Sequence, residues 1–292
     1  MSGRTVYPRL GQAIFLLVAL LVVQFLIGVV IVLFCGRVSG GSSPAIHPAA
    51  IGIGNVLSFA IVLSWAARKS RRPLREVFPF RRFRPVLLLT LPVLLIGLGI
   101  IASEADNVLR YFMPMPQSVA EIMRSVASSG AASFFTVALV APVTEELLFR
   151  SIILGGLLSR YGPRKAILIS TVLFCLSHLN PYQFFSAFVV GVVLGWLFYR
   201  TGSLWPCIIG HTFYNLCLVL AVALLPVTIP GFTPESLGWS SVQFQPPWFD
   251  VLGLALLAAG AIGLAKSLRA GNARAEQLRP AESEDPDGVP HG

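Results

Sequence analysis

A succession of long apolar segments limits this chain to one class of fold. About eight such segments occur along the 292 residues, at positions 11–34, 45–67, 86–103, 131–159, 164–179, 182–199, 204–226 and 249–268. A helix rises ~1.5 Å per residue and about 20 residues cross a bilayer core, a length that most of the segments reach. Hydrophobic residues make up 55% of the chain and charged residues only 12%, roughly half the charged fraction of soluble domains. The sequence therefore predicts an all-α, polytopic membrane helix bundle with about eight transmembrane helices.

The basic residues predict how this bundle is oriented. Most of the 22 Lys and Arg residues fall into loops that share one side if the amino terminus is cytoplasmic, above all the connector 68–84. The positive-inside rule then places both termini in the cytoplasm. This topology, with attraction to anionic lipid, accounts for the net charge of +9, so the bilayer is expected as a partner and nucleic acid is not.

Composition divides the chain into four parts. Residues 1–129 hold the N-terminal membrane spans and their connecting loops, and residues 130–226 hold the spans with unusual polar residues. Residues 227–268 form an interfacial loop and the last span, and residues 269–292 form a polar tail that we expect to be disordered. The four cysteines lie in or beside apolar spans without a C-x-x-C pair, which is typical of small core residues.

Three ionisable residues interrupt the fourth apolar segment. Glu145, Glu146 and Arg150 lie within six positions of a span in which each charged group costs a few kcal/mol or more. Glu146 and Arg150 are four residues apart and share a helix face, so we expect them to pair. Glu145 is turned about 100° around the axis, so it can face a cavity while the pair supports the helix.

Two histidines and an asparagine occupy neighbouring spans. His178 ends the fifth span four residues after Phe174, and His211 and Asn215 share one face of the seventh. The hairpin between the fourth and fifth spans sets Glu145 and His178 at similar depth, so one polar pocket is expected. A carboxylate and an imidazole can deprotonate a water there, and another imidazole and an amide can stabilise an oxyanion.

The motifs Glu145-Glu146-x-x-x-Arg150, Phe174-x-x-x-His178 and His211-x-x-x-Asn215, in this order, resemble those of the CPBP family. These are the CAAX prenyl protease and bacteriocin-processing (Abi) membrane proteins, and the resemblance covers about residues 130–226. It implies an intramembrane endopeptidase acting on a membrane-associated peptide or protein, in which Glu145 and His178 activate water and His211 and Asn215 stabilise the oxyanion. Glu146 and Arg150 would support this catalytic core. An integral protein of a bacterial plasma membrane is the expected setting.

Alternatives remain open at this point. Glu145, His178 and His211 could ligate zinc, although the chain has no H-E-x-x-H motif, and a mechanism without metal or other cofactor is favoured. Intramembrane acids and imidazoles also occur in transporters and proton relays. A third possibility is a non-catalytic scaffold or immunity protein of the same fold, in which the polar cluster only organises the helices.

Overall fold

The computed structural model describes residues 6–38, 48–121, 135–224, 228–233 and 242–277, and within these ranges the chain is helical without a β-strand. The all-α prediction is thereby confirmed. In chain order the elements are α1 (Leu10–Val38), α2 (Pro48–Ser70), α3 (Leu74–Val77), α4 (Leu87–Phe112), η1 (Thr136–Val140), α7 (Ala141–Glu146), η2 (Leu147–Leu154), α8 (Gly155–Leu158), α9 (Pro163–Ser177), η3 (Pro181–Gln183), α10 (Phe184–Thr201), α11 (Trp205–Leu224) and α12 (Pro247–Gln277).

The described residues contain five helices that are long and apolar enough to cross a membrane, so the chain is an integral membrane protein. These five stretches are Leu10–Arg37, Ala50–Ser70, Leu87–Phe112, Pro181–Thr201 and Pro247–Arg269. The fourth predicted span is a helical run divided by the π-helical turns η1 and η2, and the fifth, α9, has only 15 residues. The count of about eight spans therefore stays a prediction.

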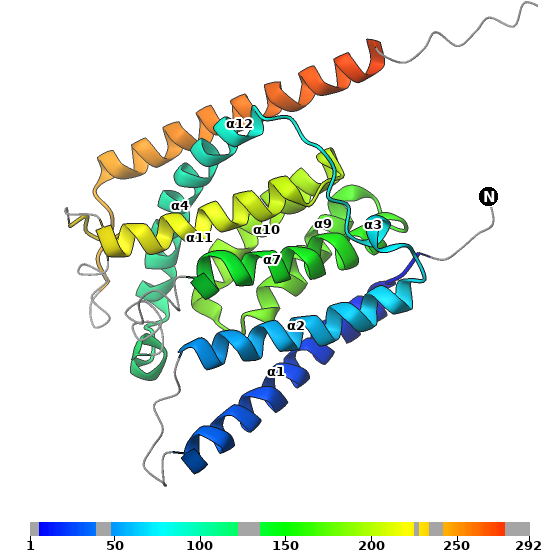
Figure 1. Ribbon diagram of the computed structural model, residues 1–292. Coiled ribbons are helices and arrows are strands. Elements are labelled where there is room, and N and C mark those ends of the chain that lie inside the picture. The colour runs from blue at the N-terminus through cyan, green and yellow to red at the C-terminus, as the bar shows by residue number, and fades with distance from the viewer. Residues whose placement is uncertain (1–5, 39–47, 122–134, 225–227, 234–241, 278–292) are drawn as a thin grey trace, which may run out of the picture.

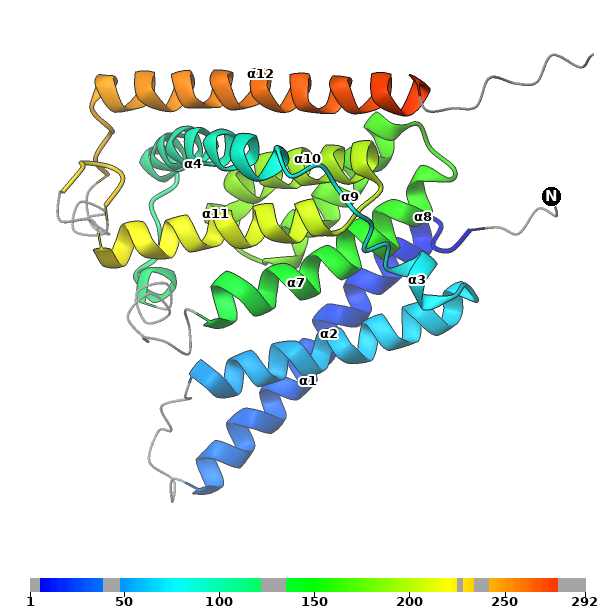
Figure 2. The same cartoon turned by 45° about the horizontal axis from the view of Figure 1, so that its top comes forward.

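The helices form three layers. The pair α1 and α2 lies on one side, the pair α4 and α12 lies on the other, and α7, α9, α10 and α11 fill the space between them (Figures 1 and 2). Buried side chains of all three layers join one apolar core, which includes Leu16, Leu95 and Leu194. The middle layer is thus surrounded by helices, and this is where the polar motif residues lie.

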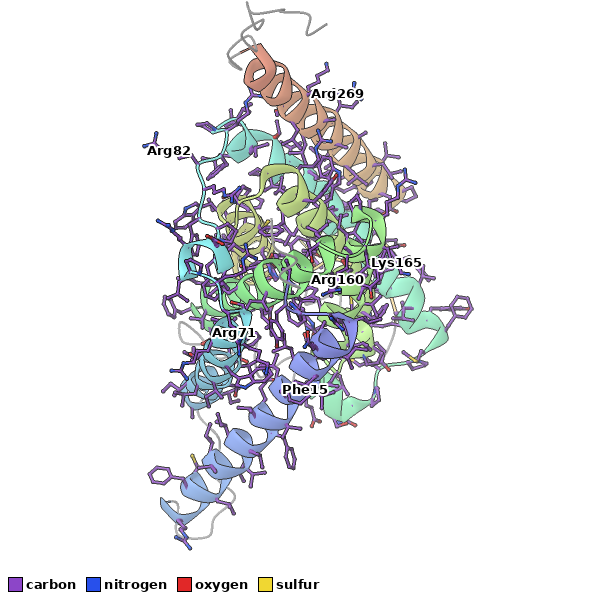
Figure 3. The ribbon with its side chains drawn as sticks, turned by 90° about the vertical axis from the view of Figure 1, so that its right-hand side faces the viewer. Phe15, Arg71, Arg82, Arg160, Lys165 and Arg269 are labelled. Carbon is purple, nitrogen blue, oxygen red and sulfur yellow. The ribbon has the colours of Figure 1, made fainter. Side chains whose placement is uncertain are left out.

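One end of the bundle is basic. The connector after α2, the turn after α8 and the end of α12 all lie at this end, together with the start of α1 (Figure 1). Figure 3 looks at the same end and shows Arg71, Arg82, Arg160, Lys165 and Arg269 around it. The predicted grouping of basic residues is therefore present in space, while the membrane side that this end faces stays a prediction.

Two helices are longer than the sequence predicts. The third span was expected to end at 103, but α4 continues to Phe112. Its polar residues are bonded inside the protein: buried Asn107 donates to the carbonyl of Gly231, and Glu104 accepts from the Gln245 backbone N–H at 3.0 Å. Likewise, α12 extends through residues 269–277, which had been assigned to the polar tail and which include helix-forming alanines.

Glycines let α4 and α12 approach each other closely. A Cβ atom added at Gly97 would lie 2.3 Å from the backbone nitrogen of Leu257, and one added at Gly260 would lie 2.3 Å from that of Leu94. Backbone atoms cannot move aside as the end of a flexible side chain can. Small residues at such positions are a common means of packing helices in membranes, where no hydrophobic force drives them together.

Because α4 and α12 are in close contact, adding a single methyl group at a glycine between them should destabilise the protein. Gly260→Ala should destabilise the protein by about 1–3 kcal/mol because the two helices must separate. Gly28 has nothing within 4 Å of its added Cβ, so Gly28→Ala should be neutral or slightly stabilising. Thermal unfolding of both variants in detergent checks this, and equal midpoints would show that the close approach is not required.

Candidate active site

A cavity of about 260 Å³ lies in the middle layer and brings together residues from all three motifs. Its walls come from η1 and α7, from the end of α9, from η3 and α10, and from α11. The lining residues are Val137, Ala141, Glu145, Phe174, His178, Gln183, Ser186, Ala187, Val190, His211, Tyr214 and Asn215. The predicted residues Glu145, His178, His211 and Asn215 are all among them. This volume is many times the roughly 10–15 Å³ that a single water requires, so water and part of a substrate can occupy it.

The two adjacent glutamates face different surroundings. The side chain of Glu145 is 15% exposed and lines the cavity, whereas that of Glu146 is fully buried. This division follows from their neighbouring positions in α7, because consecutive residues of a helix point about 100° apart. The carboxylate available to a substrate is therefore that of Glu145.

Glu146 and Arg150 form an ion pair inside the protein. The Arg150 Nε atom lies 2.9 Å from Oε2 of Glu146, and both side chains have zero exposure. The angles do not suit a hydrogen bond, and no guanidinium nitrogen of Arg150 makes one with a described residue. The guanidinium carbon lies 4.9 Å from the centre of the Phe174 ring, so the charge is stabilised by the carboxylate and by the aromatic face.

His211 lies between both glutamates. Its Nδ1 is 2.9 Å from Oε1 of Glu146, and its Nε2 is 3.7 Å from Oε2 of Glu145. A carboxylate accepts hydrogen bonds, so Nδ1 carries a hydrogen and points it at Glu146. The buried ion pair thus holds the His211 ring, and Nε2 is the ring atom presented to Glu145.

The end of α9 fixes His178. Its Nδ1 lies 3.0 Å from the carbonyl of Phe174, one turn earlier, and must donate because a carbonyl can only accept. When the ring is neutral, Nε2 can therefore accept a proton. The Phe174 ring meets His178 edge-on at 4.8 Å and His211 at 5.7 Å between ring centres. The first residue of the second motif is thus a wall shared by both imidazoles.

Asn215 bonds to a backbone carbonyl that its own helix leaves free. In the π turn η1 the Ala141 N–H bonds to Thr136, five residues back. In the same five-residue pattern the Val137 carbonyl would accept from the N–H of residue 142. Residue 142 is a proline and has no N–H. Asn215 Nδ2 fills the position and donates to the Val137 carbonyl at 2.9 Å. One hydrogen of the Asn215 amide is therefore used, and one remains.

Three polar residues of the cavity were missed by the sequence reasoning. Gln183 and Ser186 come from the start of the sixth span, three residues apart, and Tyr214 precedes Asn215 on α11. The spacing of Gln183 and Ser186 on one helix face was a usable signal. Tyr214 gave none, because an aromatic residue in an apolar span more often packs in the core.

The zinc alternative would use Glu145, His178 and His211, and the structure does not group these three side chains as a ligand set. Among the residues that the structure describes, no three His, Cys, Asp or Glu side chains are arranged to hold a metal ion. Glu145 and His211 approach each other, but together with His178 they do not make a ligand set. No step of the chemistry below is therefore derived through zinc.

Comparison with known proteins gives the same family as the motifs. Residues 127–217 match the family described as type II CAAX prenyl endopeptidase Rce1-like. The chain is 31% identical to CAAX prenyl protease 2 of Arabidopsis thaliana over 134 residues, which cover 39% of this chain and 41% of that protein. It is 32% identical to the putative membrane peptidase YdiL of Bacillus subtilis over 82 residues, covering 28% of this chain and 34% of that protein.

A third relative is UPF0177 protein YxdF of Lactococcus lactis, 29% identical over 92 residues, or 31% of this chain and 50% of that protein. The chain thus spans between a third and a half of the length of these relatives. No solved structure matches the chain. These findings confirm the resemblance to the CPBP family, and all of them concern part of the chain.

The buried pair predicts a large cost for losing one partner. Arg150→Met leaves the buried Glu146 carboxylate without its guanidinium partner, with only the His211 N–H beside it, and should destabilise the protein by about 3–5 kcal/mol. Adding Glu146→Gln removes the buried charge that has lost its guanidinium partner, so the double variant should be more stable than Arg150→Met alone. Both are measured by thermal unfolding in detergent.

The matched control is the exposed pair Arg72–Glu76, whose side chains are 41% and 48% accessible. Arg72→Met should cost no more than about 1 kcal/mol. If Arg150→Met costs as little as this control, the buried pair does not support the site.

Proposed function

We propose that this protein is an intramembrane endopeptidase that hydrolyses a peptide bond in a membrane-associated substrate. The observation that carries the proposal is the placement of Glu145, His178, His211 and Asn215 around one cavity, although they come from three separate helices. The family match supports a protease of the CAAX type. A substrate at the bilayer fits a cavity surrounded by membrane helices.

Glu145 and His178 are proposed to activate the water. The Glu145 carboxylate is accessible from the cavity and His178 has Nε2 free to accept a proton, because its Nδ1 hydrogen is bonded to Phe174. The water attacks the carbonyl carbon of the scissile bond and gives its proton to this base. The same proton then passes to the leaving nitrogen as the C–N bond breaks, which gives a carboxylic acid and an amine. The acid then passes its own proton to the amine, so the final products are a carboxylate and an ammonium group.

His211 and Asn215 are proposed to stabilise the oxyanion. Each already uses one N–H, His211 on Glu146 and Asn215 on Val137, so each is held in a fixed orientation before substrate binds. The second hydrogen on the Asn215 amide nitrogen is left as a donor. His211 Nε2 becomes the other donor when the ring carries a proton on both nitrogens, since its Nδ1 hydrogen is used on Glu146. Fixed donors that need no reorientation are what an oxyanion site requires.

The substrate is proposed to be a peptide or protein held at the bilayer, and the setting a bacterial plasma membrane. The Arabidopsis relative is named a CAAX prenyl protease, and the Bacillus relative is named a membrane peptidase. The chemistry of the cavity concerns the peptide bond and does not by itself require a prenyl group.

Replacing the accessible carboxylate gives the main test. Glu145→Gln should lower the cleavage rate by about 10²- to 10⁴-fold, since it removes a general base, while leaving the amount of folded protein unchanged. The measurement compares the peptides of membranes that contain the wild type with those of membranes that contain the variant. It therefore also reports the substrate.

Glu76→Gln serves as the control, because Glu76 lies in an exposed surface pair far from the cavity. Identical peptide profiles for wild type and Glu145→Gln would overturn the endopeptidase proposal. A cellular function that survives the same substitution would instead favour a scaffold.

Metal dependence has a separate test. The favoured mechanism predicts that activity survives a strong chelator on metal-stripped protein, because water activation is assigned to Glu145 and His178. A lasting loss of cleavage that zinc restores would establish the metal mechanism in its place.

A further inference from the structure

We propose that Gln183 and Tyr214 bind the main chain of the substrate and thereby place its scissile bond beside Glu145. This inference rests on the proposed function and deepens it. Both residues line the cavity that holds the four motif residues; Gln183 lies outside the three motifs, and Tyr214 is an unspecified position of the third. They come from different helices, so a peptide between them would be held from two sides.

Gln183 is held by a short rigid structure. It ends the 3-10 turn η3, whose cap Asn180 accepts from the Tyr182 N–H at 3.0 Å. The Tyr182 hydroxyl donates to the Pro114 carbonyl at 3.0 Å, which ties this turn to the chain that follows α4. The position of Gln183 is therefore fixed independently of its own side chain.

Within the described part of the chain, the backbone N–H and carbonyl of Gln183 are hydrogen-bonded, whereas its side-chain amide is not. Its N–H donates to the Asn180 carbonyl at 3.2 Å, and its carbonyl accepts from the Ser186 hydroxyl at 3.2 Å. Its side-chain amide makes no hydrogen bond with any described residue, although it borders the cavity. The donor and the acceptor of this amide are thus both available to a bound molecule.

Tyr214 presents the second free group. Its side chain is only 7% exposed and belongs to the apolar core, so the ring is fixed by packing. Its hydroxyl has no hydrogen-bond partner within the described ranges, while the neighbouring Asn215 is bonded to Val137. The hydroxyl is not among the fully buried atoms of the described residues that lack a partner, and Tyr214 lines the cavity, so a bound molecule can supply the missing hydrogen bond.

A peptide main chain matches these groups chemically. Each peptide unit offers one N–H and one carbonyl, which pair with the acceptor and donor of the Gln183 amide, and a further carbonyl can accept from Tyr214. A peptide that leaves water for a membrane cavity must have its backbone groups satisfied. A main-chain contact does not involve the substrate's side chains. Gln183 and Tyr214 therefore position the scissile bond without selecting a particular substrate sequence.

The test starts from a library of quenched fluorescent peptides, with and without a C-terminal farnesyl group, presented in detergent micelles. The peptide that the wild type cleaves best becomes the probe. Gln183→Leu and Tyr214→Phe should each raise KM by roughly 2- to 12-fold, the value of one neutral hydrogen bond. Their kcat should stay within about twofold, whereas Glu145→Gln loses kcat.

A backbone ester in the probe identifies the partner of Gln183. The ester replaces one peptide N–H by oxygen, so at the paired position it should raise KM for the wild type and leave KM for Gln183→Leu unchanged. An ester scan along the probe finds that position. Ester effects that are equal in both proteins at every position would overturn a main-chain contact by Gln183.

Stability separates binding from a structural role. Gln183→Leu removes an unpaired amide, so its thermal midpoint without peptide should equal or exceed that of the wild type. A midpoint several degrees lower would show that Gln183 holds the fold, which overturns the inference. Tyr199→Phe, on an exposed tyrosine of α10, is the control and should alter neither KM nor the midpoint.

If the wild type cleaves no peptide of the library, the endopeptidase proposal fails and this inference fails with it. If the wild type is active and both variants keep its KM, the endopeptidase proposal stands and only the main-chain contact is overturned.

Discussion

The fully buried carboxylate of Glu146 is the constraint on which the middle of this protein depends. An ionised group inside a helix bundle needs compensation, and here Arg150 and His211 both supply it, at 2.9 Å each. The guanidinium needs the Phe174 ring as well, which ties α9 to the same group. Three helices are therefore held at one depth by one charge, and the accessible neighbour, Glu145, is placed by their packing.

The polar pattern of the sequence was sufficient to predict most of the candidate site. The four-residue spacing of Glu146 and Arg150 predicts their pair, and the hairpin depth argument places Glu145 and His178 together, as the cavity shows. These predictions succeed because an ionisable side chain within a membrane span must pair with another group or face a polar cavity. Whether the motif residues catalyse hydrolysis stays a prediction.

Other features could not be read from the residues. The extent of α4 depends on Asn107 bonding to Gly231, a contact between positions 124 residues apart that no local pattern contains. The Val137–Asn215 bond depends on where η1 departs from α-helical geometry, which Pro142 suggests but does not locate. Gln183 shares a helix face with Ser186, which the sequence does show, but that its side-chain amide lacks a partner in the described ranges is apparent only once its surroundings are known.

The Phe174 ring contacts both imidazoles of the candidate site and the buried guanidinium of Arg150. It meets His178, His211 and Phe149 edge-on and lies under the Arg150 charge. Both imidazoles pack against this one side chain, so a change in its tilt would alter the packing of the proton-accepting ring and of the oxyanion-stabilising ring together. Substitutions of the residues that pack behind the Phe174 ring can therefore change the positions of both imidazoles while every ionisable residue of the site stays the same.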